Sequence, residues 1–264
     1  MTANLTTRWA RRCVLAIATL GLVTAASFAE AQNRERQPPM LNDDQVELIK
    51  VYEVDLDTRP APRITIPNDK LRDFLSDYQS DDRVPRGRKE QSDWLRADGH
   101  EQLRLMFQLK AREYYQHVRI KSQIDSLRAW STIHRRYILG YFQPTFGKGQ
   151  VPGLYLFPRD RDGERVELTN FYILTQTTLD GAAMIDRNAP QESLLLQWAL
   201  PRESAKFPAP DVPGWEPKFK DTDDERFAEH VDWIKSLFQA NQGSDYGIEY
   251  TLPGKKAEQN ARQD

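Results

Sequence analysis

Apolar side chains recur at helical spacing along most of the chain, with polar and proline-rich segments between them. In the first half, Val46, Ile49 and Tyr52 share one helical face and follow acidic residues, as is typical of a helix start. The pattern predicts, in order, a helix over 42–56, a short strand over 62–67, a helix over 68–78, a solvated loop over 79–91 and a helix from Trp94 to about Ile120.

The second half has a longer helical stripe, formed by Trp130, Ile133, Tyr137 and Tyr141 at positions i, i+3, i+7 and i+11. Proline, glycine and aromatic residues follow, and these favour a loop. The pattern predicts a helix ending near Tyr141, a loop over 142–149, turn-rich chain over 153–184, a short apolar helix over 190–200, a proline-rich stretch over 207–217 and a helix within 221–239. These elements together give a mainly α fold with one short strand.

The N-terminus has the organisation of a secretory signal peptide. Arginines at positions 8, 11 and 12 precede an apolar run over 13–26, and Ala29-Glu30-Ala31 supplies a small-x-small cleavage site. We expect residues 1–31 to be removed by cleavage after Ala31, leaving a periplasmic or secreted protein with no membrane span. A retained N-terminal anchor is the alternative, and the choice between Sec and twin-arginine export stays open.

Cleavage changes the composition of the mature chain. Its lone cysteine, Cys13, is lost, so no disulfide or thiol chemistry is expected. The basic residues fall from 37 to 34 and the acidic residues from 39 to 38. The resulting acidic balance argues against nucleic acid as a partner.

The familiar motifs of metal and catalytic sites are incomplete in this sequence. Residues 158–169 resemble an EF-hand loop at Asp160, Asp162 and Gly163, but Pro158 and Thr169 occupy the positions of essential ligands, so we interpret the segment as a β-turn. None of the histidines, His100, His117, His134 and His230, pairs with another at i+4 as zinc-binding helices require. Nucleophile signatures are absent as well, so we predict neither a metal site nor an enzyme.

An ordered series of segments covers about residues 123–240: STIHRRYILGY, the loop at 142–149, GLYLF, PQESLLLQWALP, FPAPDVPGW and FAEHVDWIKSLF. This series resembles the class I cytochrome c domain of secreted planctomycete proteins, and residues 42–78 look like the leader region of such proteins. The resemblance implies a linker and α-rich region over 32–122, a cytochrome c-like helical domain over 123–242 and a flexible tail over 243–264. We expect 42–120 to pack on that domain as one unit.

The chain departs from this family at every residue that would hold haem. In the family, two cysteines and a histidine follow the helix; here Phe142, Thr145 and Phe146 take their places, or Phe142, Gly147 and Lys148 if the spacing is longer. Where relatives bring the second axial ligand, this chain has Phe207-Pro208-Ala209. The resemblance therefore implies a degenerate haem site.

An empty haem-sized cavity would destabilise a small domain severely, so side chains must fill it. We expect aromatic residues to do so: Tyr141, Phe142, Phe146, Tyr155 and Phe157, with Phe207 and Trp215 opposite. The leading hypothesis is a haem-free structural or interaction module without cofactor, whose partner is unknown and is possibly another envelope protein. One alternative is an electron-transfer protein with non-covalent haem bound by His134, Tyr141 or Tyr155. Another is a small-ligand binder or enzyme with a remodelled haem pocket.

Overall fold

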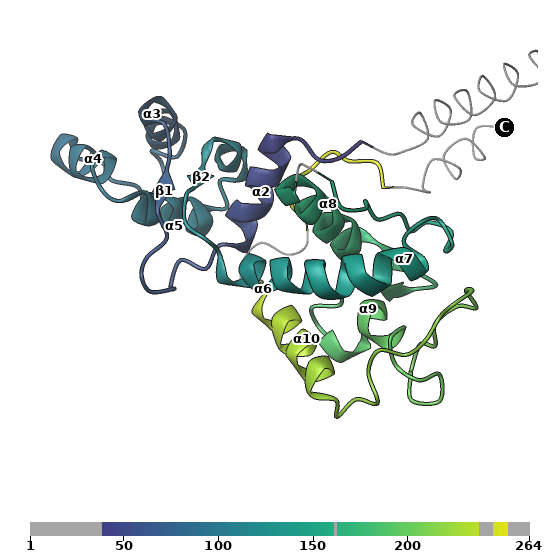
Figure 1. Cartoon of the computed structure of the whole chain (residues 1–264). Coiled ribbons are helices and arrows are strands. Elements are labelled where there is room, and N and C mark those ends of the chain that lie inside the picture. The colour runs from purple at the N-terminus through teal and green to yellow at the C-terminus, as the bar shows by residue number, and fades with distance from the viewer. Residues whose placement is uncertain (1–38, 161–162, 238–244, 253–264) are drawn as a thin grey trace, which may run out of the picture. The chain divides into compact units, whose positions relative to one another are not determined.

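The structure, a computed structural model that describes residues 39–160, 163–237 and 245–252, is rich in helices (Figure 1). The predicted signal peptide and its cleavage site lie outside these residues. The helices are α2 (Asp43–Glu53), α3 (Asn68–Asp77), α4 (Arg88–Leu95), α5 (Gly99–Leu109), η1 (Arg112–His117), α6 (Asp125–Ile133), η2 (His134–Phe142), α7 (Gln143–Phe146), α8 (Gly163–Gln176), η3 (Pro190–Glu192), α9 (Leu194–Gln197) and α10 (Glu225–Ser236). The expected mainly α class is confirmed.

Strands are few and short in the described chain. The predicted strand over 62–67 is confirmed as β1 (Ile64–Thr65), which pairs antiparallel with β2 (Arg119–Ile120). A second antiparallel pair, β3 (Thr178–Leu179) and β4 (Ala182–Ala183), was not predicted.

Helix α2 joins the two halves of the chain. Its first turn is capped by Asn42, whose side chain accepts from the Gln45 N–H at 2.9 Å while the Gln45 side chain accepts from the Asn42 N–H. The buried face of α2 packs against η1 and β2 from the first half, and against α6 and α8 from the second. The described residues from Met40 onward consequently form one compact unit, as expected.

The single helix predicted from Trp94 to Ile120 is wrong. The chain instead forms the end of α4, then α5, then η1, and α4 begins inside the expected loop over 79–91. Gly99 starts α5 so close to β1 that a Cβ there would lie 2.3 Å from the Ile64 carbonyl oxygen. Lys110 ends α5 in the left-handed conformation, with φ of 54°. The periodicity continues across these breaks, because all three helices pack on one shared core.

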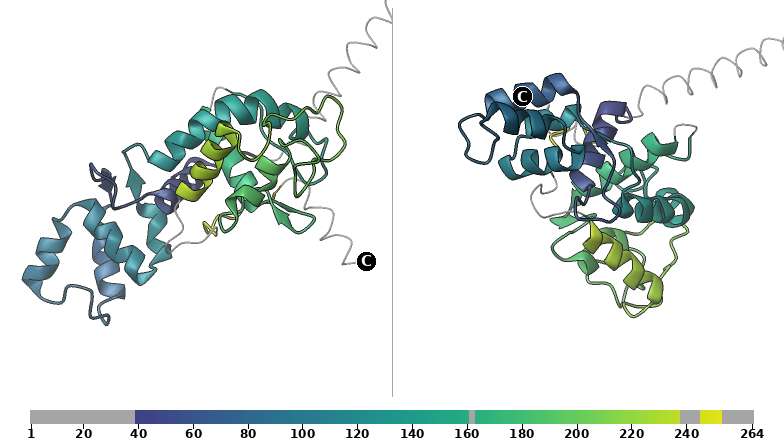
Figure 2. Two further views of the ribbon diagram at one scale, coloured as in Figure 1. Left: turned by 90° about the horizontal axis from the view of Figure 1, so that it is seen from below. Right: turned by 90° about the vertical axis from the view of Figure 1, so that its left-hand side faces the viewer.

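The helices α3, α4 and α5 gather as a group, visible in both views of Figure 2. Phe74 of α3 is fully buried at its centre. Its ring stacks on that of Trp94 at 5.5 Å and meets the edge of Tyr114 at the same distance. Aromatic packing of this kind joins α3 to α4 and to η1, short helices that would be marginal in isolation.

The helix predicted to end near Tyr141 continues to Phe146, so the expected loop over 142–149 is wrong in its first part. Helices α6, η2 and α7 run on without interruption (Figure 1). Within η2 the backbone has π-helical bonding, and the Gln143 N–H donates to the Ile138 carbonyl. The α-helical pattern resumes just before Pro144, which sits in the first turn of α7, where its missing N–H costs least.

Helix α8 falls inside the region expected to be turn-rich, and its first residues belong to the segment interpreted as a β-turn. Its buried residues surround most of the helix: Val166, Leu168, Thr169, Asn170, Phe171, Tyr172, Ile173 and Leu174. A helix buried on most sides has no polar face, so its sequence lacks the amphipathic period on which the prediction depends. The helix predicted over 190–200 is divided into η3 and α9, whereas the one predicted within 221–239 is confirmed as α10.

Residues 245–252, part of the expected flexible tail, pack on the core instead. Tyr246 is 1% exposed, and its hydroxyl donates to the Glu53 carboxylate at 2.6 Å. Arg187 forms an ion pair with the same carboxylate at 2.7 Å. A buried carboxylate needs such partners, so this arrangement fixes the segment against α2. The Gln45 side chain also donates to the Glu249 carbonyl at 3.0 Å.

Candidate functional site

Two of the expected haem-attachment positions lie inside an aromatic cluster. Phe142 and Phe146 are each 0% exposed, and their ring centroids are 4.9 Å apart. Trp198, just after α9, packs on both, with centroids 6.0 Å from Phe142 and 5.1 Å from Phe146. Tyr141 meets the edge of Phe146 at 6.1 Å. These four side chains form the aromatic cluster, in which Phe146 packs against each of the other three rings.

The other aromatic residues that we expected to fill the haem site have different surroundings in the structure. Trp215 joins the cluster through a hydrogen bond from its indole N–H to the Trp198 carbonyl at 2.8 Å. Tyr155 and Phe157 instead pair with each other at 5.3 Å. Phe207 is half-buried beneath the Lys206 ammonium group. The expectation that all seven fill one site is therefore met by only part of the set.

The remaining expected positions have different surroundings. Thr145 is half-buried, and Ala209 is 3% exposed. Gly147 is enclosed so tightly that a Cβ there would lie 2.9 Å from the Cβ of Leu156. Lys148 is exposed and lines a shallow cleft of about 420 Å3 together with Gln143.

His134, the strongest alternative haem ligand, is 2% exposed and already hydrogen-bonded. Its Nε2 atom lies 3.0 Å from the Asn170 side-chain nitrogen, which is a donor. Asn170 is fixed in turn, because its amide accepts from the Phe157 N–H at 2.7 Å and donates to the Phe157 carbonyl at 2.9 Å. Burial lowers the pKa of His134 to about 4, so the ring is neutral at pH 7 and serves as an acceptor.

The tyrosines considered as ligands are no better placed. The Tyr141 hydroxyl donates to the Glu216 carbonyl at 2.8 Å, and burial raises its pKa. Tyr155 is half-buried, and burial raises its pKa as well. An iron-binding tyrosine must lose its proton, which these environments oppose.

The residues present do not fit a haem. The rings of Phe142, Phe146 and Trp198 are in contact, so a porphyrin between them would have to displace side chains that are fully or nearly fully buried. The nitrogen of His134 that faces the interior is committed to Asn170. A haem at this place would need both a repacked core and a broken hydrogen-bond network.

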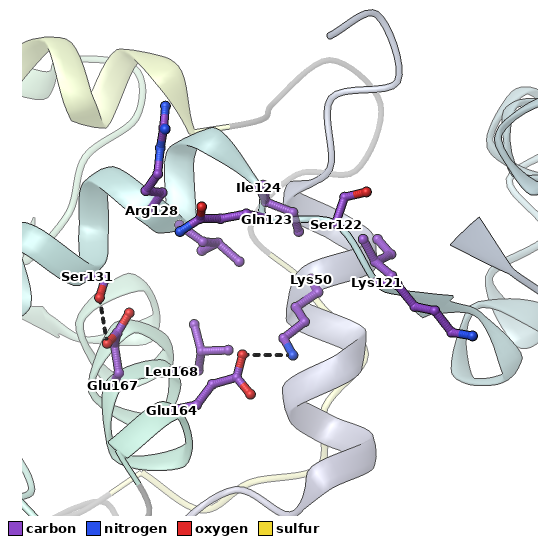
Figure 3. Close-up of a pocket in the computed structure, with 12 residues that line it drawn as sticks. Lys50, Lys121, Ser122, Gln123, Ile124, Arg128, Ser131, Glu164, Glu167 and Leu168 are labelled. Atoms are coloured by element: carbon purple, nitrogen blue, oxygen red, sulfur yellow. Dashed lines mark hydrogen bonds and ion pairs between the residues drawn. The ribbon is translucent and has the colours of Figure 1, made fainter. Parts of the chain in front are cut away.

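A polar cleft of about 430 Å3 lies elsewhere, between α2, α6 and α8 (Figure 3). Lys50 of α2 bridges it to the Glu164 carboxylate at 2.8 Å, and also pairs with Glu47 at 2.9 Å. Burial alone would lower the pKa of Lys50, but the bonds to both carboxylates outweigh it, so the pKa is raised. The ammonium group is thus charged at neutral pH.

Glu167 is the most perturbed acid of this cleft. Burial raises the pKa of its carboxyl group, and the Ser131 hydroxyl, which donates to Oε2 at 3.0 Å, offsets part of that rise. The two groups face each other across α6 and α8 (Figure 3). Apolar side chains of Ile124, Leu127 and Leu168 complete the lining. Groups of this kind suit binding of a small polar molecule.

Sequence reasoning missed Trp198, Asn170 and Glu167. Trp198 lies in a predicted apolar helix and carried no signal beyond its size. Asn170 and Glu167 are on α8, which the pattern did not predict. Their roles follow from contacts with α6, which no local pattern contains.

A scan against protein-family models and searches of the curated proteins and of the solved structures gave no match to this chain. The relationship to cytochrome c domains therefore stays a prediction. No helix in the described ranges is both long and apolar enough to cross a membrane. The same residues contain no group of three or more His, Cys, Asp or Glu placed to hold a metal ion.

Proposed function

We propose that this protein is a haem-free, cytochrome c-like structural or interaction module, exported to the periplasm or secreted. The observation that carries the proposal is the aromatic cluster. Phe142 and Phe146 stand where the family has haem-attaching residues, and both are fully buried against Trp198. Full burial of these two positions supports the proposal, because it leaves no exposed site for a macrocycle there.

The hydrogen bonds around His134 support the same proposal. Asn170 holds the His134 ring as a neutral acceptor and ties it to the Phe157 backbone. This network gives His134 a structural role between η2 and α8. Non-covalent haem is the weaker reading, because iron ligation by Nε2 would leave the amide of Asn170 buried without its acceptor.

A second candidate, a small-ligand binder, is favoured by the cleft in Figure 3. Glu167, Ser131 and Lys50 converge there on apolar side chains. This cleft is lined by α2, α6 and α8 rather than by the aromatic cluster, so it is not a remodelled haem pocket. Ligand binding there is compatible with a haem-free interior.

The test is an absorbance spectrum of the exported protein purified from a host that matures c-type cytochromes. A known c-type cytochrome, expressed in parallel, shows that the host supplies haem. We expect no Soret band in the purified protein, and on titration with haemin we expect only the broad band of free haemin, without the shift and sharpening that ligation by the protein would cause. A Soret band that survives purification would overturn the proposal, and a haem-stained denaturing gel would then separate covalent from non-covalent attachment.

A further inference from the structure

A larger cleft, of about 830 Å3, opens at the N-terminal end of α6. The chain from Glu53 to Arg63 forms one wall, and residues 121–128 form the other. Several residues, among them Lys121, Ser122 and Ile124, line both this cleft and the cleft between α2, α6 and α8.

The start of α6 leaves backbone donors available to this cleft. Its N-cap residue is Ile124, whose side chain cannot accept, and no other side chain caps the helix. The first helical N–H groups have no acceptor within a helix, and the aligned peptide dipoles concentrate positive charge there. Helix starts of this kind favour an anion.

Ser126 provides a second, independent observation. It lies in the first turn of α6, lines the cleft and is only 7% exposed. Its buried hydroxyl has no hydrogen-bond partner in the described part of the chain. Side chains on a helix tilt toward its N-terminus, and Ser126 is among the residues that line the cleft at this end of α6. A buried hydroxyl without a partner is costly, which points to a group that it binds.

The charges around the cleft favour an anion. Arg63 and Lys121 adjoin at the end of the β1–β2 pair, where the Lys121 N–H donates to the Arg63 carbonyl at 2.8 Å. Neither side chain forms an ion pair with a described residue, and both are exposed. Figure 3 shows Lys121 extending away from the Lys50–Glu164 pair. Arg59 also lines the cleft.

Three acids and one more cation line the same cleft, and two of these acids are already paired. Asp125 holds Arg128 at 3.0 Å, and the Glu53 carboxylate is held by Arg187. Asp55 accepts from the Asp57 N–H at 2.8 Å. Arg59, Arg63 and Lys121 therefore outnumber the acids that have no cationic partner.

We propose that this cleft binds an oxyanion, a phosphate group, at the N-terminus of α6. The N–H groups of the first turn and the Ser126 hydroxyl donate to it, and Arg63 and Lys121 neutralise its charge. The cleft is much larger than a bare ion, so its size suits a phosphate ester of a small organic molecule. This site goes beyond the proposed function and does not depend on the absence of haem.

Isothermal titration calorimetry of the exported protein tests this site, with inorganic phosphate, glucose 6-phosphate and glucose as probes at constant ionic strength. We expect both phosphates to bind and glucose not to bind. Tighter binding of glucose 6-phosphate assigns the site to phosphate esters, and equal affinity assigns it to the free ion. Absence of binding by both phosphates would overturn the proposal.

Paired variants locate the binding. Arg63→Ala with Lys121→Ala should weaken phosphate binding by about tenfold or more, because two charged donors are lost. Arg88→Ala with Lys89→Ala removes the same charge from α4 and should leave the affinity unchanged. Ser126→Ala should weaken binding by about two- to tenfold, as expected for one neutral hydrogen bond. An equal loss in both double variants, or none with Ser126→Ala, would refute a site at α6.

Discussion

The two ends of the long helix formed by α6, η2 and α7 have opposite surroundings. Near its C-terminal end, Phe142 and Phe146 are sealed inside the aromatic cluster. Near its N-terminal end, α6 borders two polar clefts that share lining residues. Glu167 lines one cleft, Lys121 lines both, and the first turn of α6 has no side-chain cap. One end is filled by buried aromatic rings, whereas the other is open to solvent and rich in charged side chains.

The difference separates stability from binding. Fully burying an aromatic side chain contributes roughly 1.5–3 kcal/mol, so the aromatic cluster stabilises the fold. In the clefts, removing a carboxylate such as that of Glu167 from water costs free energy. The raised pKa of Glu167 is the consequence of that cost. Groups kept in a costly state are the ones available to a ligand. If this division holds, substitutions at the two ends must change the free energy of unfolding by different amounts and in opposite directions.

The largest expected effect is that of Phe142→Ala in the aromatic cluster. Removing a fully buried ring should lower the free energy of unfolding by about 3–5 kcal/mol, measured by urea denaturation. Phe207→Ala is the matched control, because that ring is half-buried and should cost far less. Equal losses from the two substitutions would mean that the aromatic cluster does not hold the fold.

The next effect is a pH dependence that comes from His134, which lies between the two ends. Its pKa is lowered to about 4 in the folded protein by burial, while the unfolded chain keeps a value near 6.5. The unfolded state thus binds the proton first, and stability decreases as the pH falls from about 6.5 to about 4. The loss should approach about 3 kcal/mol at pH 4.

A variant isolates this histidine from the others. His134→Gln should remove most of the difference in stability between pH 7 and pH 4, although it also destabilises the protein at pH 7. The pKa of His230 is lowered by burial too, so part of the pH dependence should remain. His117→Gln, at a half-buried position on η1, should leave the pH dependence intact. If His134→Gln leaves it intact as well, burial does not keep the ring neutral.

The sequence predicted the stripe of the long helix but not its end. Trp130, Tyr137 and Tyr141 are buried as their spacing indicated. The loop prediction at 142–149 failed because Pro144 and the glycines were interpreted as breakers, whereas Pro144 lies in the first turn of α7, directly after the π-helical segment. Tertiary packing of Phe146 on Trp198 then outweighs the local preference.

The clefts were beyond reach of any sequence pattern. The Lys50–Glu164 bridge joins α2 to α8, which are far apart in the sequence. The Ser126 hydroxyl is buried without a partner only in the folded chain, where α10 packs beside it and Trp233 donates to the Ser126 carbonyl at 3.2 Å. Such sites arise from the approach of separate elements, so the local pattern of one sequence gives no signal for them.

The smallest expected effect is at Glu167 in the cleft, and its sign is the informative part. Because the pKa of Glu167 is raised in the folded protein, the ionised carboxylate opposes folding once the pH exceeds its ordinary value of 4.5. Glu167→Gln should therefore stabilise the protein at pH 7, by up to about 0.5 kcal/mol, and lose that gain below pH 4. Thermal denaturation at both pH values measures the difference.

Glu164→Gln is the matched control on the same helix. Its carboxylate pairs with Lys50 at 2.8 Å, so neutralising it should slightly destabilise the protein at pH 7 instead. Changes in stability of opposite sign at positions 164 and 167 would show that Glu164 stabilises the fold whereas Glu167 destabilises it. A destabilising acid is what we expect of a group that binds a ligand. A loss of stability from Glu167→Gln equal to that from Glu164→Gln would place both acids in ordinary surface ion pairs and leave the cleft without a strained group.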